Sequence, residues 1–491
     1  MDISDAHAVN DPSRTAVVCG GVRFNWQEWA KLTNQAADVL AGLGANPGCR
    51  GLIVSSNSWQ SIACTAALRR VGAITVPVSP ALTAHEIRYM IEHSDPKLIA
   101  ADASSAELVA KASDGRRIPI VVLDGPGGDA FWDQVAHSPS GPLAADQSGY
   151  MLYTSGTSGK PKGAFHQASP DSSVAVGYIE AFRLRSDDIH LVAGPLYHSA
   201  PAAFCSVTMS FGGTVVVLPK FDPSSALELI ETEGVTTTFM APILLKRILD
   251  LPDAELTRFD TNSLRVLIVA GSHCPFDIKV RAQKAFGDVL FEFYGSTETK
   301  AVTVITPEDQ LAKPGSCGKL MPGVAVRLVN DDGRDVPMGH QGEILVRQSD
   351  ATFDRYWADP AKTQATVRDG WVSTGDVAYQ DEDGFFYIVD RKGAVVISGG
   401  VNIYPAEIES ALLEHPSVAD AAVIGQKDEE WGERLHAIVV LRREATGSML
   451  EAYLRERLAG FKVPRSWEFV EHLGRSDDGK LRKRHLSDER E

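Results

Sequence analysis

The sequence predicts an α/β protein with a large, multi-subdomain N-terminal part of parallel βαβ sheets, a small β-barrel-like subdomain, and a small α+β domain at the C-terminal end. From the N-terminus to Phe293, apolar runs typical of buried strands alternate with amphipathic segments at helical spacing, as in parallel sheets covered by helices. From Gly318 the runs become short and closely spaced, as in antiparallel sheets. A chain of 491 residues is too long for one core, so at least two domains are expected.

The elements of the N-terminal part follow from capping residues and apolar periodicity. Asn25 and Glu28 form a capping box that opens a helix through about Leu43, and Gly44 ends it. Strands and a helix then follow in alternation. The predicted elements are strand 51–54, helix 62–71 and strand 73–78, then strands 150–153, 213–218, 236–240, 266–270 and 289–293.

The pattern of predicted elements changes twice in the remaining part of the chain. Short strands are expected at 324–329 and 342–347, followed by a hairpin of 377–379 with 385–389 around the turn 381–384. We expect a domain boundary at residues 390–393, which divides the chain into 1–390 and 391–491. In the second part, Pro405 opens a helix, and Ser448 with Glu451 forms another capping box.

The composition excludes several classes of protein. A formal net charge of −16 argues against a nucleic-acid partner, since phosphate backbones require an excess of Lys and Arg. The six cysteines are scattered without a Cys-x-x-Cys pair, which suits a reducing cytoplasm and predicts neither a zinc site nor a disulfide framework. The N-terminus has no signal-peptide pattern, and no apolar run reaches the length of about 18 residues that a transmembrane helix needs.

The most informative motif is the loop after the strand at 150–153. Residues 153–163 read Tyr-Thr-Ser-Gly-Thr-Ser-Gly-Lys-Pro-Lys-Gly. Glycines expose backbone N–H groups, hydroxyls add donors, and lysines supply positive charge, which together suit a polyphosphate. The P-loop spacing fails, because Thr154 stands where a glycine is required and Pro161 follows Lys160. A flexible linker is the alternative, but a linker would rarely carry two lysines directly after a buried strand.

Three further segments carry chemistry in the second half of the chain. Residues 293–298 read Phe-Tyr-Gly-Ser-Thr-Glu after a predicted strand, residues 373–376 read Ser-Thr-Gly-Asp, and residues 479–482 read Gly-Lys-Leu-Arg. Taken singly, these are a strand end, a turn and a solvated basic tail. Their order along the chain favours one shared site.

Together with the loop and with Arg391, these segments resemble the motifs of the adenylate-forming superfamily. That group includes acyl-CoA synthetases, the adenylation domains of peptide synthetases, and firefly luciferase. The resemblance runs from about Tyr150 to His485 in the family's order, while the N-terminal third is similar mainly in its pattern of elements. It implies ATP, Mg²⁺ and coenzyme A as cofactor and substrates, and a C-terminal domain that moves on a hinge.

The resemblance also implies residue roles. Thr154 and Glu298 would hold Mg²⁺, for which oxygen ligands are suited, and Asp376 would accept hydrogen bonds from the ribose hydroxyls. Lys480 would be catalytic, as a cation between the substrate carboxylate and the α-phosphate, and His198 would lie near the acyl pocket. The other residues expected at the nucleotide and its surroundings are Ser155, Gly156, Thr157, Ser158, Gly159, Lys160, Lys162, Gly271, Ser272, Glu292, Phe293, Tyr294, Gly295, Thr297, Arg391, Gly399 and Gly400.

The chain departs from the family pattern at the hinge and in the tail. Gly393 stands where the family has a charged pivot, and Ala394 follows where an acidic residue is frequent. Glycine accepts almost any backbone dihedral angle and can still pivot. Gly474 replaces the usual proline of the tail motif, which predicts a looser loop around Lys480.

The predicted reaction is the ATP-dependent ligation of a carboxylic acid to coenzyme A through an acyl-adenylate. The resemblance implies that an amino-acid substrate would need an Asp near His198 to pair with its α-ammonium group, as in the adenylation domains of peptide synthetases. Residues 199–204 contain no carboxylate, so a fatty, aromatic or cyclic acid is expected rather than an amino acid. The alternatives are transfer to a carrier-protein thiol, luciferase-like oxidation, and a non-catalytic nucleotide-binding protein. The expected partners are therefore small molecules, and a homodimer stays open.

Overall fold

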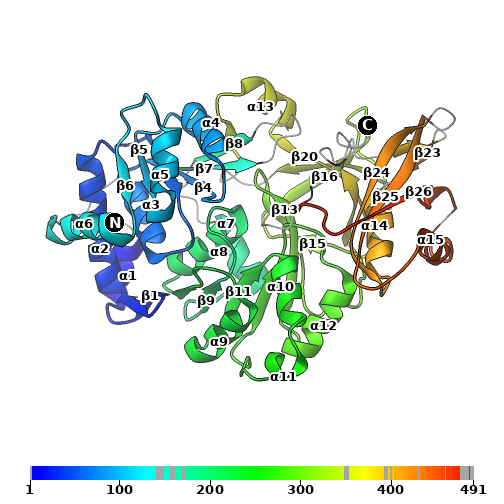
Figure 1. The fold of residues 1–491 in the computed structure, drawn as a ribbon, viewed down its shortest axis with the longest axis horizontal. Coiled ribbons are helices and arrows are strands. Elements are labelled where there is room, and N and C mark those ends of the chain that lie inside the picture. The colour runs from blue at the N-terminus through cyan, green and yellow to red at the C-terminus, as the bar shows by residue number, and fades with distance from the viewer. Residues whose placement is uncertain are drawn as a thin grey trace.

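Four β-sheets and the helices that cover them make up the described part of the chain (Figure 1). The computed structural model describes residues 3–139, 149–154, 161–167, 173–347, 353–391, 396–398, 401–403, 405–428, 432–458, 460–475, 481 and 486. Two large mixed sheets occupy the N-terminal part, and two smaller sheets follow them. The α/β class, the parallel sheets and the separate small C-terminal α+β unit are confirmed.

A seven-stranded sheet carries the hairpin of the phosphate loop. Its order is β18 (Arg355–Tyr356), β8 (Lys162–Gln167), β7 (Gly149–Thr154), β4 (Ile74–Val78), β3 (Arg50–Val54), β5 (Leu98–Ala101) and β6 (Ile120–Val122). The strands from β7 to β6 are parallel, whereas β8 and β18 run antiparallel at one edge. Apolar side chains from α2 (Trp26–Gly42), α3 (Trp59–Arg70) and α6 (Gly125–His137) pack on one face, and those from α4 (Ala84–Ser94) and α5 (Ala103–Ala112) pack on the other.

A nine-stranded sheet follows. Its order is β15 (Lys319–Leu320), β14 (Lys300–Ile305), β13 (Leu290–Ser296), β12 (Val266–Val269), β11 (Thr237–Met240), β9 (Ile189–Val192), β10 (Thr214–Val217), β1 (Thr15–Cys19) and β2 (Val22–Asn25). One face is covered by α9 (Pro223–Glu233), α10 (Pro242–Leu249) and α12 (Phe276–Phe286). The other face is covered by α7 (Ser173–Phe182) and α8 (Ser199–Ser210), and also by α2 and α3, which contribute to the cores of both large sheets.

The two smaller sheets are antiparallel except for one edge strand. The first contains β16 (Ala325–Val329), β17 (Gly342–Arg347), β20 (Trp371–Gln380), β19 (Val367–Arg368) and β21 (Phe386–Arg391), where a barrel-like unit was expected. The second contains β23 (Val401–Ile403), β22 (Val396–Ser398), β25 (Gly432–Leu441), β24 (Val418–Asp428) and β26 (Ser466–Val470), the last being parallel to β25. The chain passes from one sheet to the other between β21 and β22.

The remaining elements are short or peripheral. They are α1 (Ile3–Asn10), α11 (Asp253–Leu256), α13 (Pro360–Thr366), α14 (Pro405–Leu413), α15 (Gly447–Arg455) and the 3₁₀ turn Gly460–Lys462. The C-terminal core forms where Ile408 and Leu412 of α14 and Leu450 and Leu454 of α15 meet the sheet.

The helix caps test the expectations most directly. Asn25 caps α2, with Glu28 N–H donating to its side chain at 2.8 Å and the Glu28 carboxylate accepting from Asn25 N–H at 2.9 Å, so the predicted capping box is confirmed. The box predicted at Ser448 is wrong. Thr446 caps α15 instead and accepts from Met449 N–H at 3.4 Å, while the Glu451 carboxylate pairs with Arg455 one turn later.

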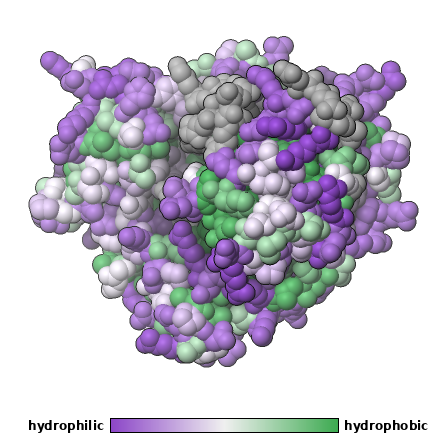
Figure 2. All heavy atoms as spheres, turned by 45° about the vertical axis from the view of Figure 1, so that its right-hand side comes forward, coloured by the Kyte–Doolittle hydropathy of each residue, from purple (hydrophilic) through white to green (hydrophobic). Residues whose placement is uncertain are grey.

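The surface, the helices and the thiols add three findings. Figure 2 shows a largely hydrophilic face on which apolar side chains gather in separate groups. None of the helices in the described ranges has the length and apolar character needed to cross a bilayer. All six cysteines are buried free thiols.

Candidate functional site

The predicted phosphate loop lies between two paired antiparallel strands, β7 and β8. Thr154 ends β7, Lys162 begins β8, and the two residues face each other across the hairpin. Tyr153, next to Thr154, is anchored by a 2.9 Å hydrogen bond between its hydroxyl and Nδ1 of His93 in α4. The Pro161 carbonyl accepts from the Tyr89 hydroxyl at 2.9 Å. The stems of the loop are therefore held by side chains of α4.

The segment 293–298 is the end of β13 and the turn into β14. Reciprocal hydrogen bonds of 3.1 Å hold this turn, from Ser296 N–H to Thr299 Oγ1 and from Thr299 N–H to Ser296 Oγ. Gly295 is required here, because a Cβ atom at this position would lie 1.8 Å from the Lys300 carbonyl oxygen. The turn places Glu298 at the tip of the hairpin.

Glu298 meets the phosphate-loop hairpin through Tyr356. The Tyr356 hydroxyl donates to Glu298 Oε1 at 2.7 Å, and the Lys162 ammonium lies 5.8 Å from the centre of the Tyr356 ring. Burial and repulsion by Lys362 lower the pKa of Lys162, while Asp359 and Glu298 oppose that shift. The carboxylate of Glu298, the ammonium of Lys162 and the hydroxyl-bearing end of β7 are thus brought to one place.

The residues at this place fit a magnesium ion shared with a nucleotide. A carboxylate and a threonine hydroxyl are hard oxygen ligands, and Mg²⁺ is typically bound by one or two such protein groups plus substrate phosphates. In the described ranges no cluster of three or more His, Cys, Asp or Glu side chains forms a complete metal cage. A site with so few protein ligands suits a Mg²⁺ ion that binds together with the phosphates of a nucleotide.

Asp376 lies at the other end of the same region. It is buried in β20, and its Oδ2 accepts a 2.6 Å hydrogen bond from the Tyr294 hydroxyl of β13. Burial and the Asp376 carboxylate raise the pKa of Tyr294 well above its usual value, so the phenol remains a donor. Asp376 is also the cross-strand partner of Arg391 in β21, so two residues that are fifteen positions apart in the sequence become neighbours.

Comparisons with known proteins identify the family of this chain. The model of the AMP-binding enzyme family matches residues 4–357, and the model of the C-terminal domain of AMP-binding enzymes matches residues 407–480. This chain belongs to the AMP-binding enzymes. The predicted membership of the adenylate-forming superfamily is confirmed, as is its assignment to the ligases of the acyl-CoA synthetase type.

Relatives of this AMP-binding enzyme include proteins with different acids and acceptors. A feruloyl-CoA synthase of an Amycolatopsis species is 35% identical over 96% of this chain and 95% of its own length. A fatty acid–[acyl-carrier-protein] ligase of Streptomyces coeruleorubidus is 32% identical over 98% of this chain and 94% of its own. The structure of an O-succinylbenzoate coenzyme A synthetase of Bacillus subtilis with ATP and magnesium ion is 26% identical, with a TM-score of 0.87 over 99% of this chain and 98% of that one.

Several other expected residues of the AMP-binding enzyme lie on β13 and near it. Phe293 belongs to an aromatic cluster with Phe182, Phe204 and Phe239, at ring-centre distances of 5.9 to 6.2 Å. Glu292 is engaged in a buried ion pair with Lys279 of α12, so we leave it out of the proposed nucleotide site. Thr297 lies in the turn that carries Glu298.

Gly271 and Ser272, which are expected at the nucleotide and its surroundings, follow β12, and His198 precedes α8. Gly271 is exposed with φ of +95°, a conformation that favours glycine, and Ser272 follows it half-buried. Nε2 of the next residue, His273, lies 3.3 Å from Ser410 Oγ of α14, which joins this loop to the C-terminal unit. His198 is the residue before the first turn of α8, and its ring lies 4.7 Å from that of Tyr197.

The remaining expected site residues fall outside the described part of the chain. They are the loop residues Ser155, Gly156, Thr157, Ser158, Gly159 and Lys160, together with Gly399, Gly400 and Lys480. For Arg391 the structure describes the backbone pairing alone.

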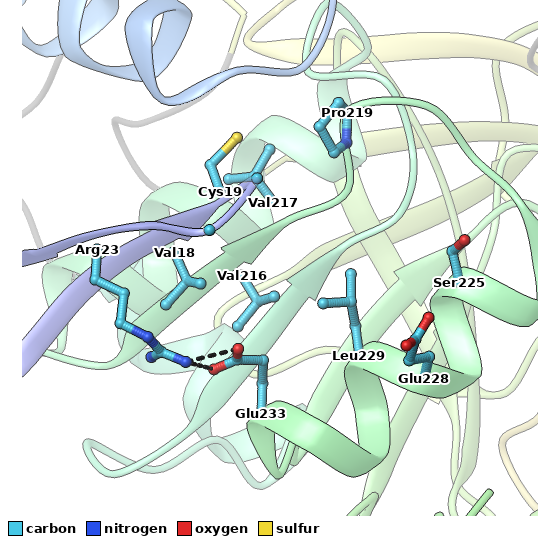
Figure 3. Close-up of a pocket in the computed structure, with 12 residues that line it drawn as sticks. Val18, Cys19, Arg23, Val216, Val217, Pro219, Ser225, Glu228, Leu229 and Glu233 are labelled. Carbon is cyan, nitrogen blue, oxygen red and sulfur yellow. Dashed lines mark hydrogen bonds and ion pairs between the residues drawn. The ribbon is translucent and has the colours of Figure 1, made fainter.

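A separate groove lies away from these residues. It encloses about 260 Å³ between the β1–β2 turn, the end of β10 and α9, and Figure 3 shows Arg23 reaching across it to Glu233 with two hydrogen bonds of 2.6 Å. None of the expected site residues lines this groove, and the charges of Arg23 and Glu233 are paired with each other.

Sequence reasoning missed the residues that support Glu298 and Lys162. Tyr356 lies in a strand of only two residues, too short to show a period. The Asp359-Pro360 pair that begins α13 was a usable signal, because Asp359 caps this helix and accepts from Lys362 N–H at 2.9 Å. It would have located the helix that brings Lys362 close to Lys162.

Proposed function

We propose that the protein is an ATP-dependent carboxylic acid–CoA ligase that works through an acyl-adenylate with release of pyrophosphate. The observation that carries the proposal is a series of contacts that joins three of the four sheets. It runs from Asp376 to Tyr294, along β13 to Glu298, and through Tyr356 to Lys162 at the phosphate loop. Tyr294 and Glu298 are four residues apart, at most about 14 Å of extended chain, so one nucleotide can reach both.

In this proposal each group has a defined task. Asp376 accepts the ribose hydroxyls and orients the nucleotide. Thr154 and Glu298 hold magnesium, which offsets phosphate charge when bound, and Lys162 adds a positive charge beside them. The substrate carboxylate then attacks the α-phosphate, and Lys480 stabilises the charge that develops where the two anions meet. Positioning and charge stabilisation carry the step without a covalent enzyme intermediate.

The acid is proposed to have a neutral, apolar tail. The first turn of α8, which follows His198, has no acidic residue. On that face of the nine-stranded sheet, α7 contributes Tyr178 and Phe182 and α8 contributes Phe204, which pack with Phe293 of β13 as one aromatic group. An ammonium group would be costly to bury in such surroundings, whereas a fatty or aromatic tail would gain by burial.

Coenzyme A is the proposed acceptor, and a carrier-protein thiol is the alternative. The C-terminal unit, proposed to be residues 391–491, would rotate between the two half-reactions so that the thiol can reach the acyl carbon. In the described structure it is joined to the N-terminal part by the His273–Ser410 contact and by a 3.2 Å hydrogen bond from Ala406 N–H to Asp390 Oδ2. We place the reaction in the reducing cytoplasm, in keeping with six buried free thiols.

The test is pyrophosphate release with a panel of fatty, aromatic and amino acids, each with and without coenzyme A. Acid-dependent pyrophosphate release, and AMP plus thioester formation on adding coenzyme A, are the expected results. Adenylate formation that proceeds to product only with a carrier protein would favour the alternative acceptor. A protein that binds ATP and releases no pyrophosphate with any acid would contradict the ligase proposal.

A further inference from the structure

The hydroxyl of Tyr356 contacts the carboxylate that is proposed to bind magnesium. It donates to Glu298 Oε1 at 2.7 Å, although the two residues are 58 positions apart in the sequence. The Tyr356 side chain is buried, with 7% of its surface exposed. A hydrogen bond from a buried donor to a carboxylate is among the stronger ones in proteins, so this contact restrains the orientation of Glu298.

The position of the Tyr356 hydroxyl is itself set by the phosphate-loop hairpin. Tyr356 pairs with Ala164 of β8, and Trp357 N–H donates to the Gly163 carbonyl at 2.7 Å. Tyr356 N–H donates to Thr363 Oγ1 at 3.0 Å, and its ring packs against Phe353 at 4.7 Å. The backbone of Tyr356 is therefore fixed to β8, and Phe353 packs against its ring.

Glu298 has the complementary restraint on its backbone. The Ser296–Thr299 hydrogen bonds hold the turn that carries it. With the backbone held, the side chain of Glu298 can still rotate. Ordering a Glu side chain costs up to about 2 kcal/mol of conformational entropy. The hydrogen bond from Tyr356 orders that side chain before any ligand arrives.

We propose that Tyr356 is a positioning residue for the magnesium–nucleotide site: it holds one oxygen of Glu298, leaves the other for the metal, and ties that carboxylate to the hairpin that carries the phosphate loop. This inference rests on the proposed function of Glu298. Partners of metal-binding carboxylates typically change metal affinity by about 10- to 100-fold when they are removed.

The competing explanation is that the hydrogen bond to Glu298 only gives the buried hydroxyl a partner. In that case Tyr356 would matter solely because its ring packs with Ala164 and Phe353. Tyr356→Phe separates the two, because it keeps the ring and removes the hydroxyl. The matched control is Tyr387→Phe, which removes a hydroxyl that donates to the Asp381 carboxylate at 3.3 Å in the small antiparallel sheet.

The measurement is calorimetric binding of α,β-methylene-ATP, which cannot be cleaved at the reacting bond, at a series of Mg²⁺ concentrations. For Tyr356→Phe we expect the Mg²⁺ concentration for half-maximal nucleotide affinity to rise about 10-fold or more. The affinity for AMP in the absence of Mg²⁺ should stay within about twofold. Tyr387→Phe should match the wild type in both measurements.

Several outcomes would overturn the inference. An unchanged Mg²⁺ dependence in Tyr356→Phe would show that the hydroxyl has no role in metal binding. An equal loss of AMP and Mg²⁺-dependent affinity would show a structural role alone. In a Glu298→Gln background, Tyr356→Phe should have little further effect on Mg²⁺ dependence, and fully additive losses would also contradict the inference. If the wild-type protein itself showed no Mg²⁺-dependent nucleotide binding, the proposed function would fail first.

Discussion

The hydrogen bond between Tyr294 and Asp376 offers the sharpest test of the proposed nucleotide site. In the proposal, the Asp376 carboxylate accepts hydrogen bonds from the two ribose hydroxyls. The Tyr294 hydroxyl donates to its Oδ2 at 2.6 Å. Asp376→Asn keeps the shape and removes the charge. Each hydrogen bond to a charged acceptor contributes about 1.5 kcal/mol or more. Two such bonds amount to roughly 3 kcal/mol, so we expect AMP affinity to fall about 100-fold.

Tyr294→Phe removes one donor to the same carboxylate and leaves the ribose contacts in place. We expect a smaller loss of AMP affinity, about tenfold, because the carboxylate is less well oriented. In the Asp376→Asn background the same change should cost little. A double-mutant cycle should therefore give a coupling energy within the range of about 0.5 to 3 kcal/mol that contacting residues show.

The assay is calorimetric titration with AMP, 2′-deoxy-AMP and 3′-deoxy-AMP. The wild-type protein should bind each deoxynucleotide about tenfold more weakly than AMP, because one hydroxyl is missing. Asp376→Asn should lose most of this discrimination. If the variant binds AMP with wild-type affinity and still discriminates against the deoxynucleotides, Asp376 does not contact the ribose and the reasoning is refuted.

Three further predictions concern the proposed catalytic lysine, the proposed hinge and acid stability. Lys480→Ala should reduce adenylation by about 100-fold or more and spare thioester formation from supplied acyl-adenylate, and normal pyrophosphate exchange would contradict its role. Gly393→Pro fixes one backbone dihedral and should block thioester formation while acyl-adenylate still forms; single-turnover kinetics of each half-reaction test this, and equal losses in both would indicate misfolding. Burial lowers the pKa of His166 and His190 to about 3. Between pH 6.5 and 3 the unfolded chain therefore binds more protons than the folded chain, and the free energy of unfolding decreases as the pH is lowered, by about 1.4 kcal/mol per pH unit for each histidine. Urea midpoints that stay flat from pH 6.5 to 4.5 would contradict this, and His190→Asn should reduce the slope.

Local patterns were read correctly where one short segment contains the whole interaction. The Asn25–Glu28 capping box closes within four residues, and the predicted hairpin 377–379 with 385–389 is seen in β20 and β21 around the turn 381–384. The failed cap shows the limit of such patterns. Ser448 with Glu451 matches the capping-box pattern, but α15 begins at Gly447, and Thr446, two residues earlier than Ser448, accepts the hydrogen bond from Met449 N–H.

The sequence by itself determined the fold class, the order of the motifs and the family of this protein. These depend on apolar periodicity and on residue types at short spacing, both of which can be recognised within a single segment of the sequence. Long-range pairing decided the rest. Glu292 stood beside a nucleotide motif, yet the packing of α12 against β13 gave it Lys279 as a partner. Asp376 and Tyr294, and Glu298 and Tyr356, are joined only when separate sheets meet. No local pattern encodes such contacts, because their geometry depends on how distant elements pack.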